Sequence, residues 1–386
     1  MTPTAPPGET SIIEEHLDRL VAFEPTTFPV LSVYVNAQPD QHGRDPDIGA
    51  FLRREFKRLG ATWPASSPER ESFEKDVSKV LSYVEKELAP SANGVAIFAC
   101  SGAGDLFEAI QLNAPIDQNR VYVYNQPHLF HLARIDDEYP RYAAVIADAR
   151  SARIFVFGLG QTLDSEQIKG KKMHRVKVGG WSQARYQRRV GNAHKQHAKE
   201  LAEALQRIVS EDKIAHIVMS GDPAFLNLLQ EELPKHVAEL VVDTVKLEIK
   251  ADEQEIFTAT MEKMREFDAK TDAEKAQRLI EQYRGGGLAV AGIEGTLEAL
   301  ANGQVEELLI SANLEGSRPA QEPVEAILAP EIPDPSGGTE SDEPRPASVP
   351  DLLVTKAKQT DAEVTFIQDG SLLAGVEGVG GFLRWR

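Results

Sequence analysis

The sequence has little of three things: cysteine, long apolar runs and net positive charge. Its 386 residues include a single cysteine, Cys100, which excludes a disulfide framework and a cysteine-ligated zinc site. No run of about 18 apolar residues occurs, so no membrane-spanning helix is expected. Residues 1–10 are rich in proline and threonine and lack the basic and apolar parts of a secretory signal. We therefore expect a cytoplasmic protein with no membrane partner.

The charge of the chain is unevenly distributed. The net charge is −18, which argues against a general nucleic-acid-binding surface, because phosphate groups are bound by clustered Lys and Arg. Residues 168–199, however, contain ten Lys and Arg, three His and no Asp or Glu. When these ten positive charges are subtracted from the net charge of −18, the rest of the chain has a net charge of −28. One strongly basic segment on an acidic chain predicts a local contact with phosphate or RNA.

The length and the order of the predicted elements indicate an α/β protein with three domains. An N-terminal α+β domain is expected over residues 1–138. A central α/β domain over 139–275 carries the basic segment, and a C-terminal α/β sandwich covers 276–386. Residues 315–350, rich in Pro, Glu, Ser and Gly, are expected to be a disordered insertion in the third domain.

Hydrophobic periodicity gives the positions of the predicted elements. Strands are expected at 28–35, 94–100, 121–124, 142–148, 152–157, 214–220, 240–242, 288–291, 305–311, 364–367 and near the C-terminus. Helices are expected at 69–88, 192–210, 224–233, 251–283 and 295–302. The segment 129–132 is short and apolar.

Two stretches of the third domain resemble a known family. Residues 287–310 read GLAVAGIEGTLEALANGQVEELLI, and residues 378–386 read GVGGFLRWR. Both are similar, in the right order, to the C-terminal domain of the archaeal and eukaryotic class-one peptide release factors and Pelota. The resemblance implies an α/β sandwich similar to ribosomal proteins that bind kinked RNA. In the release factors this domain docks protein partners, and the glutamates between the apolar positions fit such a surface.

A second match lies in the basic segment. Residues 177–189 read KVGGWSQARYQRR and resemble the mobile Gly-Gly-Gln loop of the release factors. Gly179 and Gly180 match the two glycines of that loop. Trp181 stands where the family has its glutamine, and the nearest glutamine is Gln183. The first domain lacks an Asn-Ile-Lys-Ser motif and the cysteine-containing stop-codon signature, which argues against codon reading and for rescue, surveillance or hibernation.

The resemblance implies roles for residues of this loop, expected at 179–189. Gly179, Gly180 and Gln183 are the candidate catalytic residues, because a backbone N–H or an amide near paired glycines can position a water at the ester joining peptide and tRNA. The basic and aromatic residues around them are the candidate RNA-binding residues, since cations hold phosphate and aromatic rings stack on bases. These are Lys171, Lys172, Arg175, Lys177, Trp181, Arg185, Tyr186, Arg188, Arg189 and Lys195.

Three functions are compatible with these residues. The first is a ribosome-associated translation factor that enters the A site and releases or rescues stalled peptidyl-tRNA by ester hydrolysis. The second is a non-catalytic hibernation or surveillance factor, in which the basic segment only binds. The third is a tRNA-cleaving nuclease. The expected partners are ribosomal RNA and peptidyl-tRNA, with a translational GTPase as a further partner of the family kind; no cofactor and no metal is expected.

Two pairs of histidines receive simpler interpretations. His194 and His197 lie three residues apart on one predicted helix face, with no carboxylate or cysteine ligand nearby, so we expect contacts to RNA and not a metal site. His128 and His131 lie on an apolar segment and are expected to be structural.

Asp148 and Asp222 end predicted strands of the central domain. Small-molecule sites form at such positions in α/β sheets, but the hydrogen bonding of turns explains both residues more simply.

Overall fold

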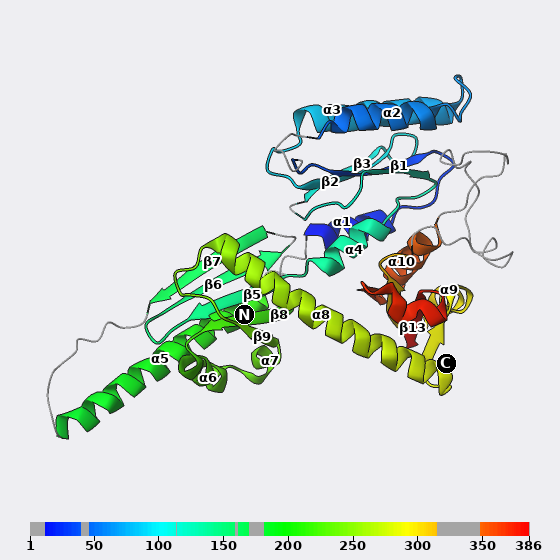
Figure 1. The fold of residues 1–386 in the computed structure, drawn as a ribbon. Coiled ribbons are helices and arrows are strands. Elements are labelled where there is room, and N and C mark those ends of the chain that lie inside the picture. Colours follow the sequence, from blue (N-terminus) through cyan, green and yellow to red (C-terminus); the bar gives the residue numbers. More distant parts are fainter. Residues whose placement is uncertain are drawn as a thin grey trace, which may run out of the picture. The chain divides into compact units, whose positions relative to one another are not determined.

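The computed structural model describes residues 12–39, 46–112, 114–158, 161–169, 181–314 and 348–385. These residues form two compact units (Figure 1). One unit comprises Tyr139–Thr271. The other combines the described residues of Ser11–Glu138 with those of Asp272–Arg386. The mixed α/β class predicted from the sequence is confirmed by three sheets with helices packed on them.

The first part of the chain forms an antiparallel sheet in the order β3-β2-β1-β4. Its strands are β1 (Val30–Asn36), β2 (Gly94–Cys100), β3 (Leu106–Leu112) and β4 (Arg120–Tyr124). Two helices, α2 (Ile48–Gly60) and α3 (Pro68–Lys86), pack on one face through a core that includes Leu31, Val33 and Val35 of β1. The predicted strands at 28–35, 94–100 and 121–124 and the helix at 69–88 are confirmed. Helix α2, helix α1 (Ile12–Val21) and strand β3 were not predicted.

The last part of the chain forms a second sheet, in the order β10-β13-β11-β12. Its strands are β10 (Ala289–Ala291), β11 (Val305–Ser311), β12 (Glu363–Ile367) and β13 (Val379–Leu383). Three helical elements accompany it: α9 (Ile293–Ala301), α10 (Val349–Gln359) and the 3-10 helix η1 (Gly370–Val376). Glycine in β13 is needed for close packing, since a Cβ on Gly380 would lie 2.7 Å from Leu279 Cδ2 and 2.8 Å from the Val290 carbonyl oxygen. All four predicted strands of this part are confirmed.

These two sheets belong to one unit because α4 (Phe130–Glu138) packs against α10 and β12. The carboxylate of Asp351, on α10, is fully buried and accepts hydrogen bonds from the backbone N–H groups of Leu129 and Phe130, at 2.5 and 3.2 Å. It therefore satisfies free N–H groups at the start of α4, as a capping side chain does. The Phe130 ring also meets Phe366 of β12 edge to face at 5.3 Å.

Replacing Asp351 by alanine should lower the free energy of unfolding by about 2–3 kcal/mol, because a cap is lost and buried N–H groups are left without an acceptor. Urea unfolding of the full chain measures the loss. Asp369→Ala is the control, because Asp369 accepts from Ser371 N at an exposed helix start, and about 1 kcal/mol or less is expected there. Equal stability of the two variants would contradict the capping role of Asp351.

The central unit contains a five-stranded sheet in the order β7-β6-β5-β8-β9. Its strands are β5 (Tyr142–Ala147), β6 (Ser151–Gly158), β7 (Gln161–Lys169), β8 (His216–Gly221) and β9 (Val241–Val245). The neighbours β5, β8 and β9 are parallel, whereas β6 pairs antiparallel with both β5 and β7. The predicted strands are confirmed, but β7 was missed because its residues are mostly polar.

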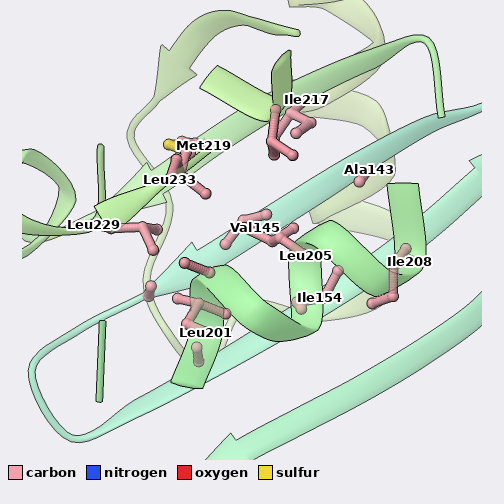
Figure 2. Close-up of a cluster of buried hydrophobic side chains, with 14 of the residues drawn as sticks. Ala143, Val145, Ile154, Leu201, Leu205, Ile208, Ile217, Met219, Leu229 and Leu233 are labelled. Atoms are coloured by element: carbon pink, nitrogen blue, oxygen red, sulfur yellow. The ribbon is translucent and has the colours of Figure 1, made fainter. Parts of the chain in front are cut away.

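Helices cover both faces of this sheet. On one face lie α5 (Trp181–Glu211), α6 (Pro223–Glu232) and the short α7 (Lys235–Ala238), which share a core with the strands (Figure 2). On the other face lies the first part of α8 (Glu253–Arg284), where Tyr142 Oη is 3.0 Å from Thr260 Oγ1 and the rings of Phe157 and Phe257 are 5.3 Å apart. The prediction of a long helix at 251–283 is confirmed.

The predicted insertion at 315–350 falls mainly outside the described residues, which omit 315–347. Its predicted end is wrong by two residues, because α10 begins at Val349 after Ser348, whose hydroxyl accepts from Asp351 N. The three domain ranges 1–138, 139–275 and 276–386 stay a prediction.

Candidate functional site

Most of the predicted site lies where the structure gives no side-chain positions. Gly179 and Gly180 fall outside the described residues, as do four candidate RNA-binding residues: Lys171, Lys172, Arg175 and Lys177. For six others the backbone is described as part of α5 and the side chains are not: Trp181, Gln183, Arg185, Tyr186, Arg188 and Arg189. The catalytic and RNA-binding assignments therefore stay predictions.

The structure corrects the expected extent of the loop at 179–189. Helix α5 begins at Trp181, so residues 181–189 are helical. The physical reason lies in the sequence, because residues 181–190 contain no glycine or proline and include alanine, glutamine and arginine, which favour helices. The paired glycines thus directly precede a helix, and Gln183 lies in its first turn.

Helix α5 is held to the sheet by its C-terminal half. Leu201, Leu205 and Ile208 point into the core toward Val145 and Ile154 (Figure 2). Among the α5 residues whose side chains the structure describes, the apolar members of this core begin at Ala198. Figure 1 shows the N-terminal half of α5 extending beyond the sheet of its own unit. At 1.5 Å per residue, residues 181–196 form a helical segment about 24 Å long.

We call residues 181–196 of α5 the basic arm. It contains Arg185, Arg188, Arg189 and Lys195, and the first acidic residue of the helix is Glu200. The N-terminal end of a helix also carries a partial positive charge, because its first N–H groups have no partner within the helix. Sequence and backbone therefore concentrate positive charge in one protruding segment.

Lys195 is the one candidate RNA-binding residue whose side chain is described. It is 67% exposed, and its Nζ lies 3.3 Å from Glu232 Oε1 on α6. An exposed ion pair of this kind contributes little stability and exchanges readily. Lys195 is therefore accessible to a phosphate, at the cost of a weak contact with Glu232.

The expectation that His197 contacts RNA is wrong. Its side chain is buried, and its ring stacks on Phe225 at 5.2 Å. Burial lowers the pKa of His197, and the ring belongs to the core. Helical periodicity explains the error, because His197 lies on the same face as Leu201 and Leu205, whereas His194 lies closer to the surface.

Asp148 and Asp222 stabilise turns, as predicted. Asp148 Oδ1 accepts hydrogen bonds from the backbone N–H groups of Arg150 and Ser151, at 2.7 and 2.8 Å. Asp222 caps α6 by accepting from Ala224 N at 3.2 Å. Gly221 before it has φ +141°, and a Cβ there would lie 1.8 Å from the Ala147 carbonyl oxygen.

His128 and His131 are structural, also as predicted. Both are buried, and Tyr122 Oη lies 2.8 Å from His131 Nε2. Burial, reinforced by His128, Arg120 and Arg134, holds the pKa of His131 far below its ordinary value of 6.5.

The depressed pKa of His131 predicts a loss of stability in acid. Below pH 6.5 the unfolded chain protonates this histidine and the folded chain does not, so the free energy of unfolding falls as the pH falls. We expect this residue to account for about 2 kcal/mol between pH 7 and pH 5. Urea unfolding at pH 7, 6 and 5 measures it: the stability difference between wild type and His131→Gln should shrink by that amount. A difference that does not change with pH would contradict the buried, neutral state.

Among the described residues, no group of three or more His, Cys, Asp or Glu could hold a metal ion. No helix in the described ranges is long and apolar enough to cross a membrane.

Comparisons with known proteins agree with the resemblance seen in the sequence. Residues 127–265 match the family described as bacterial archaeo-eukaryotic release factor family 10. The chain is 22% identical over 303 residues to peptide chain release factor subunit 1 of Methanocaldococcus jannaschii, covering 74% of this chain and 70% of that protein. It is 24% identical over 341 residues to the protein of the same name from Methanopyrus kandleri, covering 80% and 78%.

Solved structures of the same group are similar at low identity. The archaeal translation termination factor aRF1 has 16% identity and a TM-score of 0.27, with 97% of both chains covered. Dom34 of S. cerevisiae, a translation termination-like factor, has 10% identity and a TM-score of 0.43, with 76% of this chain and 79% of that chain covered. The family match spans α4 and most of the central unit, including the basic arm. The chain is therefore similar to the archaeal release factors over most of its length, and its match to the bacterial family 10 is carried by the unit that bears the basic arm.

Proposed function

We propose that this protein is a ribosome-associated translation factor that enters the A site and releases stalled peptidyl-tRNA by ester hydrolysis. The relatives named peptide chain release factor subunit 1 support the class of function. Rescue of stalled ribosomes fits better than ordinary termination, because the first part of the chain lacks the family's codon-reading motifs.

One observation carries the proposal. The basic arm is a helical segment without Asp or Glu that extends from its unit, whereas the whole chain has a net charge of −18. An acidic protein is repelled by ribosomal RNA over most of its surface, so a contact must be local. A protruding helix with clustered arginines can enter a groove or tunnel lined by phosphate groups. The paired glycines directly precede, in the sequence, the positive end of the helix dipole.

The chemistry proposed for this end of α5 is addition of water to an ester. A water oxygen attacks the carbonyl carbon that joins the peptide to the tRNA ribose, the carbon–oxygen bond to the ribose breaks, and the ribose oxygen takes up a proton. Gln183 in the first turn, or a backbone N–H near Gly179 and Gly180, orients the water and stabilises the negative charge on the carbonyl oxygen. The flanking arginines hold the tRNA or ribosomal RNA in place.

A second candidate is a non-catalytic factor that occupies the A site, as in hibernation or surveillance. It is favoured by Trp181, which takes the position of the family's glutamine and could stack on a base without supporting hydrolysis.

Peptide release from purified ribosomes stalled with labelled peptidyl-tRNA distinguishes the two candidates. If the protein is a hydrolase, it binds the ribosomes and releases the labelled peptide faster than the protein-free control does. Binding without release would establish the non-catalytic factor, and failure to co-sediment with ribosomes at low salt would overturn both.

A further inference from the structure

Helix α2, in the unit that does not contain the basic arm, is amphipathic. Its apolar residues face the sheet: Ile48, Leu52, Phe56 and Leu59 are all buried in the core shared with α3. They recur at helical spacing, and Asp47 caps the helix start by accepting from Ala50 N at 2.8 Å. The position and rotation of α2 on the sheet are therefore fixed by packing, and so is the face that it turns outward (Figure 1).

The outward face carries four cations: Arg53, Arg54, Lys57 and Arg58. Arg53 and Lys57 are four residues apart, as are Arg54 and Arg58, so the four cations form two adjacent pairs within two turns of the helix. The side chains of Arg53, Arg54 and Arg58 are 57%, 73% and 48% exposed, and Lys57 is also exposed. We call this set the α2 cationic face.

Nearby carboxylates neutralise this face only in part. Glu55 lies 3.4 Å from Arg54 and 3.0 Å from Arg58, and Glu85 of α3 lies 2.9 Å from Arg53. Lys57 has no carboxylate partner within the part of the chain that the structure describes. Exposed pairs of this kind contribute about 0–1 kcal/mol each, so a phosphate can replace the carboxylate at little cost.

We propose that the α2 cationic face binds the phosphate backbone of RNA, as a contact separate from the basic arm. Charge complementarity selects this occupant: four cations lie together on one helix face, on a chain with a net charge of −18. A protein-docking surface usually has an apolar centre, but none of the large exposed apolar side chains among the described residues lies on α2. Insertion into a membrane is also disfavoured, because the apolar side of α2 is already buried.

The consequence is that RNA is contacted by both units of the chain. Two linked contacts raise the affinity more than either alone, because the second forms at a high effective concentration. The proposal does not depend on hydrolysis, and it holds for a hydrolase and for a non-catalytic factor alike.

Binding to a labelled A-form RNA duplex, and separately to purified ribosomes, over a range of salt concentrations tests the proposal. The α2 variant is Arg54→Gln/Lys57→Gln/Arg58→Gln in the full chain. The control is Lys75→Gln/Lys86→Gln/Lys235→Gln, which removes the same charge from exposed positions elsewhere. We expect the α2 variant to bind both probes about tenfold more weakly at 0.1 M salt, with a slope of log K against log salt reduced by about 2, and the control to bind as wild type.

Several results would overturn the proposal. One is that the α2 variant binds RNA with the same affinity as wild type. Another is that the control loses as much affinity as the α2 variant, which would mean that binding depends on net charge and not on this face. A loss on ribosomes without a loss on the duplex would assign the face to an acidic protein. If Arg185→Gln/Arg188→Gln/Arg189→Gln alone weakens binding, the basic arm is supported and the α2 contact fails. Unchanged circular dichroism and melting temperature establish that each variant is folded.

Discussion

Replacing Gln183 by alanine is expected to lower the rate of peptide release from stalled ribosomes by about 100-fold, with little change in ribosome affinity. A side chain that acts on the developing negative charge stabilises the transition state more than the bound substrate, and removing one such donor typically costs about 100- to 1,000-fold in rate. Gln183, in the first turn of α5, is the first glutamine of this helix after the paired glycines in the sequence.

The matched control for Gln183 is Gln187→Ala. Gln187 lies one turn further along α5, about 6 Å from Gln183 along the axis, and has the same chemistry. Release by this variant should equal that of wild type. If the two variants release peptide equally fast, Gln183 has no part in the chemistry, and a backbone N–H becomes the remaining candidate.

Reversing the charge of the basic arm should weaken ribosome binding by more than about 100-fold at 0.1 M salt. The variant is Arg185→Glu/Arg188→Glu/Arg189→Glu. Each phosphate contact that is lost lowers the slope of log K against log salt by about 0.7–0.9, and three new carboxylates add repulsion. Co-sedimentation with ribosomes between 50 and 300 mM salt gives both the affinity and the slope.

A control for the arm must change the same charge in the same unit. Lys235→Glu/Lys246→Glu/Lys250→Glu meets this requirement, because all three lysines are exposed and none lies in α5. Its affinity should stay within about threefold of wild type, since screening weakens distant charges. A control as weak as the arm variant would mean that binding follows net charge and not the arm.

Where strong periodicity or apolar runs occur, the sequence was sufficient to predict the elements. The fully buried strand at Gly94–Cys100 and the long helix Glu253–Arg284 were predicted nearly to the residue. Helix α2 carried a usable signal, because apolar residues recur at 48, 52, 56 and 59, and that signal was missed. Prediction of helix α2 would also have revealed the α2 cationic face. Its four positive charges cannot be seen in the net charge of −18 for the whole chain.

Other features depend on contacts that no local pattern reveals. Strand β7 is polar and is held by pairing with β6, so its sequence lacks the alternation of a half-buried strand. The buried cap formed by Asp351 joins residues 222 positions apart, and it unites parts of the chain that were predicted as separate domains. For the site, the paired glycines suggested a long loop, whereas the helix-forming residues after them set the true boundary at Trp181.

The most direct test of the central claim is hydroxyl-radical probing from the basic arm. An iron chelate attached through Val190→Cys would be selective, because Cys100 is buried and burial raises the pKa of its thiol to about 11, which keeps it unreactive. The ester of a peptidyl-tRNA lies at the peptidyl-transferase centre of the large subunit, and the proposed hydrolysis places the arm there. In complexes with stalled ribosomes, we therefore predict cleavage of large-subunit ribosomal RNA around this centre. Cleavage confined to other regions of the ribosome, or none in complexes that co-sediment, would contradict the proposed placement of the arm.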